Sequence, residues 1–231
     1  MVNSPSFWMV MALTISIIIS WLTLRKIPVK SEVLSDHAVR IHFDYAHPVP
    51  GSFARFSSDP LFEWHSFATI SIPEEKGFSV IVSRAGDWTS KVIANPPTSL
   101  WVRGVPTCGA LRVVPLFRRI ILVCTGSGIG PIAPHLFRPG RAPMILLWVS
   151  RDVRKTFGDK FVDAVLRASP DAIIYDTRKH GKPNMVKLAY RMYKDFDAEA
   201  VAVLSNQRLT EKVVYGLLSR GVPAFGPIFD S

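Results

Sequence analysis

The strongest constraint on the fold is an alternation of buried apolar runs with longer amphipathic stretches in the second half of the chain. Apolar runs at residues 118–126, 144–150, 172–176 and 200–205 are separated by stretches whose apolar residues recur at helical spacing. Repeated strand and helix units of this kind predict a doubly wound parallel α/β domain. Ligands of such sheets bind at the carboxyl ends of the strands, and candidate functional residues are therefore expected there.

The chain from Ile27 to Cys108 carries a different pattern. Short β-branched and aromatic runs are broken by turn residues, which predicts a small antiparallel β-barrel or sandwich. We therefore expect a β-barrel over residues 27–114 and an α/β domain over residues 115–231.

The N-terminal segment is apolar and carries no charged side chain before Arg25. Its run from Phe7 to Leu24 is long enough to predict a transmembrane helix within an anchor of residues 1–26. Arg25, Lys26 and Lys30 follow this run, so we expect a single-pass membrane protein whose remaining part is cytoplasmic. A buried segment or a cleaved signal peptide is the alternative.

Charge and cysteine content narrow the possible functions. The 28 Lys and Arg residues against 18 Asp and Glu give a net charge of +10, which suits a polyphosphate cofactor or an anionic membrane surface. Nucleic acid is not expected as a partner, because aromatic residues lie in core-like runs and are not interleaved with basic ones. Two cysteines cannot form a disulfide framework, and the six histidines show no spacing typical of a metal site.

A glycine-rich turn is the strongest local motif. It follows an apolar run directly and precedes a helical pattern, where backbone N–H groups can approach a pyrophosphate. The alternative is a tight strand-to-helix connection without a ligand. The predicted cofactor-binding residues of this turn are Thr125, Gly126, Ser127, Gly128, Ile129, Gly130 and Pro131.

Four further motifs occur in a fixed order around this turn. Residues 63–67 resemble the E-W-H-P-F-[ST] flavin motif, residues 86–89 the G-D-W-T segment, residues 104–109 a G-P-[YF]-G loop and residues 181–184 a G-R-P-[ND] turn. Together these motifs resemble the ferredoxin–NADP reductase superfamily, in the form found in ferric reductases and NADPH oxidases. Within it, the likeness is greatest to fungal TmpA-like integral membrane proteins.

The resemblance implies an FAD site on the barrel. His65 and Phe67 would flank the flavin, unless they form a barrel core pair. The residue expected to hydrogen-bond the flavin is Ala68 here, so Ser66 or Thr69 would replace it or the flavin is bound less well. The residues expected to hold the FAD pyrophosphate, or alternatively to cap a helix, are Gly86, Asp87, Trp88 and Thr89.

The resemblance also implies a nicotinamide nucleotide site. Ser150 and Arg151 end an apolar run where relatives read the adenosine 2′ substituent, and a guanidinium there favours NADPH over NADH. Ser205 would lie beside the nicotinamide as a catalytic residue, and Phe229 or Phe225 would cover the flavin.

The implied activity is an FAD-dependent NAD(P)H oxidoreductase. A hydride would pass from nicotinamide to flavin, and electrons would pass on to an unidentified acceptor. The predicted span contains no histidine, so this acceptor would be a soluble molecule or a separate haem-bearing membrane subunit. The alternative is a non-catalytic reductase-like membrane protein with a weakened flavin site, acting in assembly or signalling.

Overall fold

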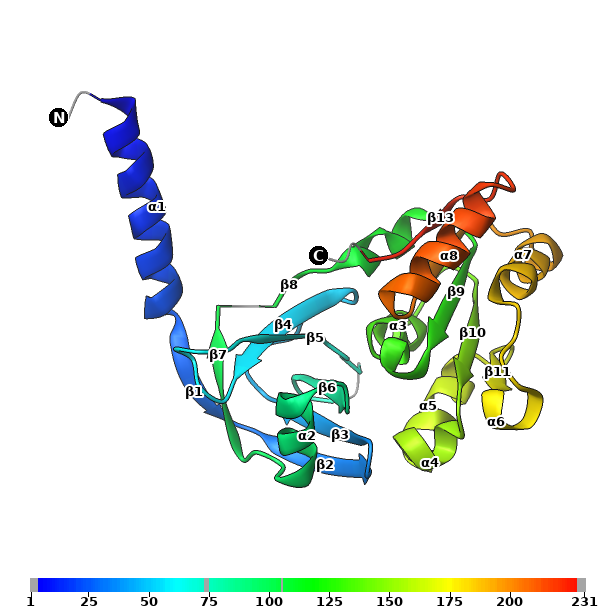
Figure 1. The fold of residues 1–231 in the computed structure, drawn as a ribbon, viewed down its shortest axis with the longest axis horizontal. Helices are drawn as coiled ribbons and strands as arrows, with labels where there is room; N and C mark the ends of the chain where they lie inside the picture. The colour runs from blue at the N-terminus through cyan, green and yellow to red at the C-terminus, as the bar shows by residue number, and fades with distance from the viewer. Residues whose placement is uncertain (1–3, 73–74, 105, 228–231) are drawn as a thin grey trace.

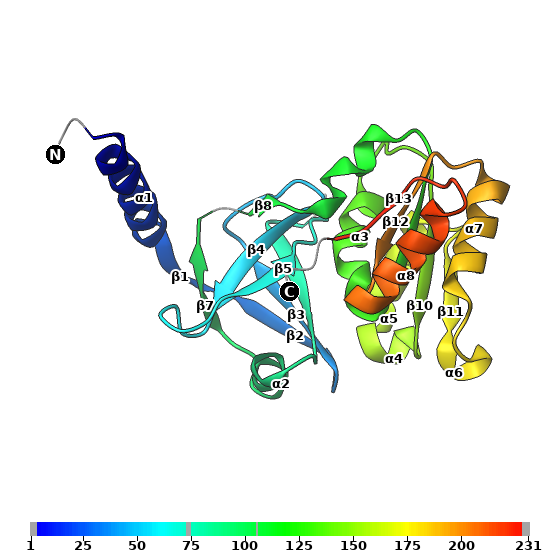
Figure 2. The same cartoon turned by 45° about the horizontal axis from the view of Figure 1, so that its top comes forward.

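The computed structural model describes residues 4–72, 75–104 and 106–227. The described chain has three structural parts, a helix and two domains (Figure 1). An N-terminal helix leads into an antiparallel β domain, and a parallel α/β domain follows. In both views the β domain lies between the N-terminal helix and the α/β domain (Figure 2). This order agrees with the sequence prediction, while the residue boundaries of the domains stay predictions.

Helix α1 (Pro5–Leu22) forms from the apolar N-terminal run. Pro5 stands in its first turn, where the missing N–H costs no helical hydrogen bond. Among the described residues, no helix is long and apolar enough to cross a membrane. This finding contradicts the prediction of a transmembrane helix over Phe7–Leu24. The end of that run leaves the helix, because Leu24 begins strand β1 (Leu24–Pro28), which pairs with β7 (Ser99–Arg103).

The β domain consists of two antiparallel sheets. One has the strand order β1-β7-β4-β5, with β8 also paired to β4, and the other has the order β2-β3-β6. Its remaining elements are β2 (Lys30–Ser35), β3 (Ala38–Phe43), β4 (Ser52–Ser57), β5 (His65–Ala68), β6 (Phe78–Ser83), α2 (Asp87–Ala94) and β8 (Thr107–Cys108).

Stacked rings form the centre of the β domain. The ring of Phe43 lies 4.3 Å from that of Phe56 and 5.0 Å from that of Phe78, centroid to centroid. These rings come from three different strands, so they tie the two sheets together. The predicted small antiparallel β domain is confirmed.

The α/β domain has a parallel sheet in the order β11-β10-β9-β12-β13. Its strands are β9 (Ile120–Thr125), β10 (Met144–Ser150), β11 (Ile173–Asp176), β12 (Ala200–Leu204) and β13 (Ala224–Phe225). Every strand pair is parallel, which confirms the predicted parallel α/β domain. The strand order changes direction between β9 and β12, so the crevice at their carboxyl ends is where a ligand is expected.

Helices cover both faces of this sheet. The apolar sides of α3 and α5 pack on one face, and those of α7 and α8 pack on the other. The helical elements are η1 (Ala110–Leu116), η2 (Gly126–Gly128), α3 (Ile129–Phe137), α4 (Val153–Phe157), α5 (Asp159–Ala168), α6 (Thr177–His180), α7 (Met185–Phe196) and α8 (Gln207–Leu218).

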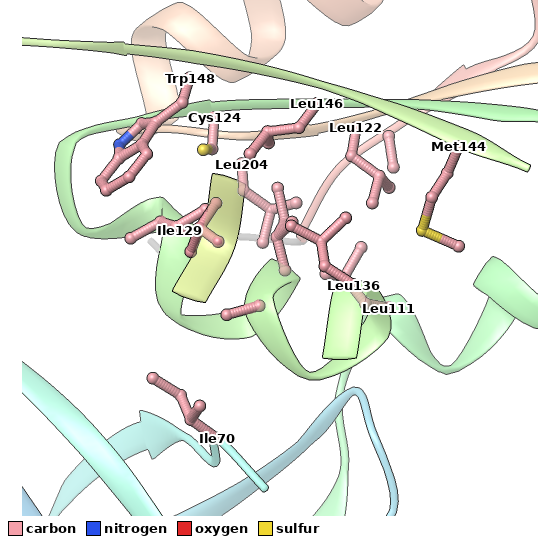
Figure 3. Close-up of a cluster of buried hydrophobic side chains, with 14 of the residues drawn as sticks. Ile70, Leu111, Leu122, Cys124, Ile129, Leu136, Met144, Leu146, Trp148 and Leu204 are labelled. Atoms are coloured by element: carbon pink, nitrogen blue, oxygen red, sulfur yellow. The ribbon is translucent and has the colours of Figure 1, made fainter. Parts of the chain in front are cut away.

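The two domains share a hydrophobic core. Ile70, Ala38 and Ile81 of the β domain belong to the same buried cluster as Ile129 and Ile132 of α3. Figure 3 shows Ile70 reaching toward α3 from the β-domain side of this cluster. Burial of these apolar groups stabilises the contact between the domains and thereby fixes the groove between them.

Candidate functional site

A groove of about 610 Å³ lies between the β domain and the α/β domain. Strand β5 and the start of α2 form one wall, and the glycine-rich turn and the end of β12 form the other. It brings together ten of the residues predicted from the sequence: Ser66, Phe67, Thr89, Thr125, Gly126, Ser127, Gly128, Gly130, Pro131 and Ser205.

The glycine-rich turn leaves β9 at the predicted crevice. Gly126 has φ +50°, a left-handed conformation that favours glycine, and a Cβ there would meet no atom within 4 Å. At Gly128 a Cβ would lie 2.5 Å from the carbonyl oxygen of Leu204, so any side chain would displace backbone. Ile129 belongs to the buried core and does not line the groove. The turn thus offers bare backbone to a ligand on its open side.

A hydroxyl pair closes the end of strands β9 and β12. The Oγ1 of Thr125 and the Oγ of Ser205 are 2.5 Å apart, and the backbone N–H of Ser205 donates to the Oγ1 of Thr210. Asn206 caps α8 by accepting from the N–H of Leu209. Ser205 therefore has a fixed position in the groove.

Strand β5 presents its side chains alternately. His65 stacks on Trp88 of α2, with ring centroids 3.9 Å apart, and its Nε2 lies 3.2 Å from the Oε2 of Glu63 without hydrogen-bond geometry. Phe67 also packs near Trp88, at 5.8 Å, and in addition lines the groove. Trp88 itself is buried, and its Nε1 donates to the Oγ of Ser58.

The two candidates for the missing flavin contact are placed differently. Ser66 and Ala68 both line the groove. Thr69 is buried outside it, and its hydroxyl donates to the carbonyl oxygen of Ser52. Ser66 is therefore the candidate that remains accessible to a ligand.

The N-terminus of α2 is capped by the side chain of Thr89, a residue of the helix itself. The Oγ1 of Thr89 accepts from the N–H groups of Ala85 and Gly86 and donates to the Gly86 carbonyl oxygen, each at 2.9 Å. The hydroxyl thus acts as a cap, which agrees with the capping alternative, and phosphate contacts are left to the backbone. A Cβ added at Gly86 would meet no atom within 4 Å, and Asp87 is exposed beside it.

Arg84 is a groove residue that the motifs did not single out. It lines the groove directly before α2, and its guanidinium donates to the carbonyl oxygen of Asp36 at 2.8 Å. Its position two residues before Gly86 of the G-D-W-T segment is the signal that could have identified it. A cation at this point favours binding of a pyrophosphate.

The predicted 2′-phosphate residues lie outside the groove, at the end of β10. Ser150 and Arg151 are followed by Asp152, whose carboxylate lies 3.6 Å from the guanidinium of Arg178 after β11. The backbone N–H of Arg178 donates to Asp176 and lowers the pKa of that carboxyl, with a smaller contribution from the Asp152 N–H. The sequence alone did not place Arg178 beside Asp152, because only the pairing of β10 with β11 brings these two side chains together.

Of the two aromatic residues predicted to cover the flavin, the structure describes only Phe225. Phe225 stacks on Phe117, with centroids 5.4 Å apart, in a cleft next to the groove. Phe229 lies outside the described residues. Within the described residues, no group of three His, Cys, Asp or Glu side chains could hold a metal ion.

Comparison with known proteins gives relatives of two kinds. The family model for the C-terminal domain of adenylate-forming reductase 03009 matches residues 110–231, more than half of the chain. The chain is 63% identical over 231 residues to adenylate-forming reductase 03009 of Coprinopsis cinerea, covering all of this chain and 22% of the relative. It is 30% identical over 148 residues to NADPH oxidase 3 of Rattus norvegicus, covering 53% of this chain and 25% of the relative. The chain thus spans about a fifth to a quarter of the length of these curated relatives.

Solved structures show the same fold. A ferredoxin NADP+ reductase from Neisseria gonorrhoeae with bound FAD and NADP has a TM-score of 0.69 at 13% identity, covering 89% of this chain and 99% of that one. Full-length CYP116B46 from Tepidiphilus thermophilus has a TM-score of 0.72 at 20% identity, covering 90% of this chain and 29% of that one.

These comparisons confirm the ferredoxin–NADP reductase-like fold and the relation to NADPH oxidases. They do not confirm the finer likeness to TmpA-like proteins, since the relative of highest identity reported above is an adenylate-forming reductase. The chain therefore belongs to the family of the adenylate-forming reductase 03009 C-terminal domain, built on a ferredoxin–NADP reductase-like fold.

Proposed function

We propose that the chain is an FAD-dependent oxidoreductase that takes a hydride from NADPH. The observation that carries this proposal is one groove that is lined by Phe67 and Ser66 of the β domain and also by the glycine-rich turn and Ser205 of the α/β domain. Such a groove can hold two cofactors face to face, and binding both in one orientation supplies much of the rate of a hydride transfer. The relatives named reductases and NADPH oxidases support this assignment.

The residues present fit both cofactors. The open space at Gly126 and Gly86 leaves backbone exposed where phosphates would approach, and Arg84 adds a cation on the barrel side. Phe67 and Ser66 are accessible to a ring system. Bound FAD would supply the hydride acceptor, because no protein side chain can perform that chemistry.

The side chains of the chain itself would bind and orient. Thr125 and Ser205 hold each other in place, so a nicotinamide amide group would meet hydroxyls of fixed position. Ser150, Arg151 and Arg178 would bind the 2′-phosphate, which favours NADPH over NADH. The shared core under α3 would keep the two cofactors in register.

A spectroscopic experiment tests this proposal. The full chain is purified in detergent, FAD is added, free FAD is removed, and the visible spectrum is recorded before and after anaerobic NADPH. We expect a bound flavin band that NADPH bleaches. Failure to retain FAD would contradict the proposal and favour the non-catalytic alternative.

Two glycine variants sharpen the test. Gly126→Val places a side chain in the space expected for the pyrophosphate, so FAD should stay bound while bleaching by NADPH is lost. Gly140→Val is the matched control, because Gly140 also has a positive φ and open space but lies outside the groove. Equal bleaching in both variants would show that the nucleotide does not bind at this turn.

Association of α1 with a lipid bilayer is a separate proposal. Large apolar side chains on several sides of α1 are exposed, and the exposed fraction of Leu22 is 78%. Arg25 and Lys26 follow shortly after the helix, where they could contact anionic headgroups. The reductase would then lie on the cytoplasmic face and pass electrons to a soluble acceptor or a haem-bearing membrane protein. Flotation with anionic vesicles tests it. The full chain should float, and a chain beginning at Leu24 should not; equal flotation would contradict the proposal.

A further inference from the structure

A second cleft, of about 1090 Å³, adjoins the groove. The two hollows share Ser66 and Pro227, so they are continuous along strand β5 and the segment after β13. The floor of this cleft is the β4–β5 sheet face, and η1 forms a wall. A molecule bound there would lie next to the site where the hydride is delivered.

The walls of the cleft are apolar and aromatic. Phe53 lies on the sheet face, and Phe117 and Phe225 form a stacked pair across from it. Leu116 is 79% exposed at the rim. Half-buried aromatic rings and an exposed leucine gathered in a concavity, with no described segment covering them, are typical of a ligand site.

One cation stands among these apolar groups. Arg55 pairs with Ser66 in the antiparallel register of β4 and β5, so the two side chains project from the same face. The Arg55 guanidinium lies over the Phe53 ring, 5.6 Å from its centroid. Among the described residues no carboxylate forms an ion pair with Arg55, and none lines the cleft. Its charge is therefore available to a ligand.

We propose that this cleft binds the electron acceptor and that the acceptor is a planar aromatic anion of the quinone class, carrying a carboxylate or sulfonate. The ring system would lie between Phe53 and the Phe117–Phe225 pair, and the anionic group would be held by the fork of Arg55. The proposal rests on the proposed function for its electrons. Each turnover converts NADPH, a proton and the quinone into NADP+ and the hydroquinone, so that two electrons leave the nucleotide and both are taken up by the quinone.

Binding is tested first, with redox-inert probes. 2-Naphthoate carries the anionic group on an aromatic ring, and 2-naphthalenemethanol is its uncharged counterpart. Calorimetry on the full chain should show 2-naphthoate binding that weakens about tenfold in Arg55→Gln, the size expected from loss of one charge-assisted contact. Binding of the alcohol should not change. Arg191→Gln, on α7 away from the cleft, is the control and should bind both probes as the unmodified chain does.

A second variant tests the apolar wall. Leu116→Ser should weaken both probes equally, because it removes apolar contact without touching the charge. Leu116 is exposed, so this change should leave the melting temperature unaltered. Unchanged 2-naphthoate binding in Arg55→Gln, or equal loss of both probes there, would overturn the proposal.

Turnover separates this proposal from the proposed function. With NADPH as donor, Arg55→Gln should raise KM for 1,4-naphthoquinone-2-sulfonate about tenfold while kcat stays the same, and KM for uncharged 1,4-naphthoquinone should not change. If NADPH does not bleach the flavin of the unmodified, FAD-loaded chain, the proposed function fails, and with it the acceptor role. If NADPH bleaches the flavin but neither quinone is reduced, only the acceptor cleft is refuted. If both are reduced and Arg55→Gln alters neither KM, only the acceptor cleft is refuted.

Discussion

The indole N–H of Trp148 donates a hydrogen bond to the carbonyl oxygen of Gly126, at 2.9 Å. Trp148 is fully buried on β10, where it packs against Phe157 and Phe161, so its ring has a fixed position. The bond thereby ties the glycine-rich turn to the centre of the sheet. The turn is ordered before any nucleotide binds, which reduces the entropy cost of binding.

Trp148→Phe should weaken nucleotide binding, and because Trp148 is fully buried it should also lower the stability of the α/β domain. Phenylalanine keeps most of the apolar contact but cannot donate to Gly126. We expect KM for NADPH to rise about fivefold, the effect of about 1 kcal/mol, with a smaller change in kcat. Steady-state kinetics check this, and Trp101→Phe on β7, outside the groove, is the control. An unchanged KM would show that the turn does not depend on this bond.

Gly128→Ala should destabilise the fold. The added methyl would lie 2.5 Å from the carbonyl oxygen of Leu204, and two parallel strands would have to separate to admit it. We expect a loss of about 1–3 kcal/mol in the free energy of unfolding, measured by urea denaturation. Gly86→Ala, where a Cβ meets no atom within 4 Å, should cost much less. Equal losses would contradict the crowding at Gly128.

Arg151→Ala should remove the preference for NADPH. A guanidinium bound to the 2′-phosphate contributes a charge-assisted contact, so kcat/KM for NADPH should fall about tenfold or more, while that for NADH stays constant. Arg154→Ala is a matched control, because Arg154 lies three residues away and already pairs with Asp159 and Asp163. Equal rates with NADPH and NADH in the unmodified chain would refute this assignment.

Stability should fall as the pH drops from about 6.5 toward 4. Burial, together with the positive charges of Arg138 and Arg112, lowers the pKa of His135 to about 4. Between these pH values the unfolded chain binds a proton at this histidine that the folded chain does not, so acid favours unfolding. Below about pH 4 the full contribution, about 3 kcal/mol, is lost.

Urea denaturation between pH 4.5 and 7 measures this dependence. His135→Gln should flatten the curve in that range, because glutamine does not titrate. His180→Gln is the control, since His180 is exposed. A curve of the same slope in His135→Gln would assign the pH dependence to other groups.

Local patterns in the sequence predicted most of the fold. Strands β9 and β12 are buried on both faces, so they read as continuous apolar runs between glycine and polar residues. The glycine-rich turn was also predicted from a local pattern, because its residues are contiguous in the sequence. Helix α1 was found where the apolar run begins, but that run could not show that Leu24 pairs with Arg103, which ends the helix.

The parts of the site that the sequence did not predict depend on pairing between distant segments. Ser205 meets Thr125 across 80 residues, and Trp148 meets Gly126 across 22. Arg55 carries no motif, and only the β4–β5 register places it beside Ser66. Periodicity reports which face of its own element a residue occupies, whereas these contacts are set by the register between elements.

The packing of Ile70 against side chains of α3 limits how the β domain and the α/β domain can be recombined with domains of other proteins. The barrel completes the core of its neighbour, so an α/β domain cut free would expose an apolar patch around Ile129 and Ile132. If one domain were exchanged between related reductases, the residues on both sides of that contact would have to be exchanged with it. The shape of the groove therefore depends on both domains together, because each contributes residues to the shared core and to the groove walls.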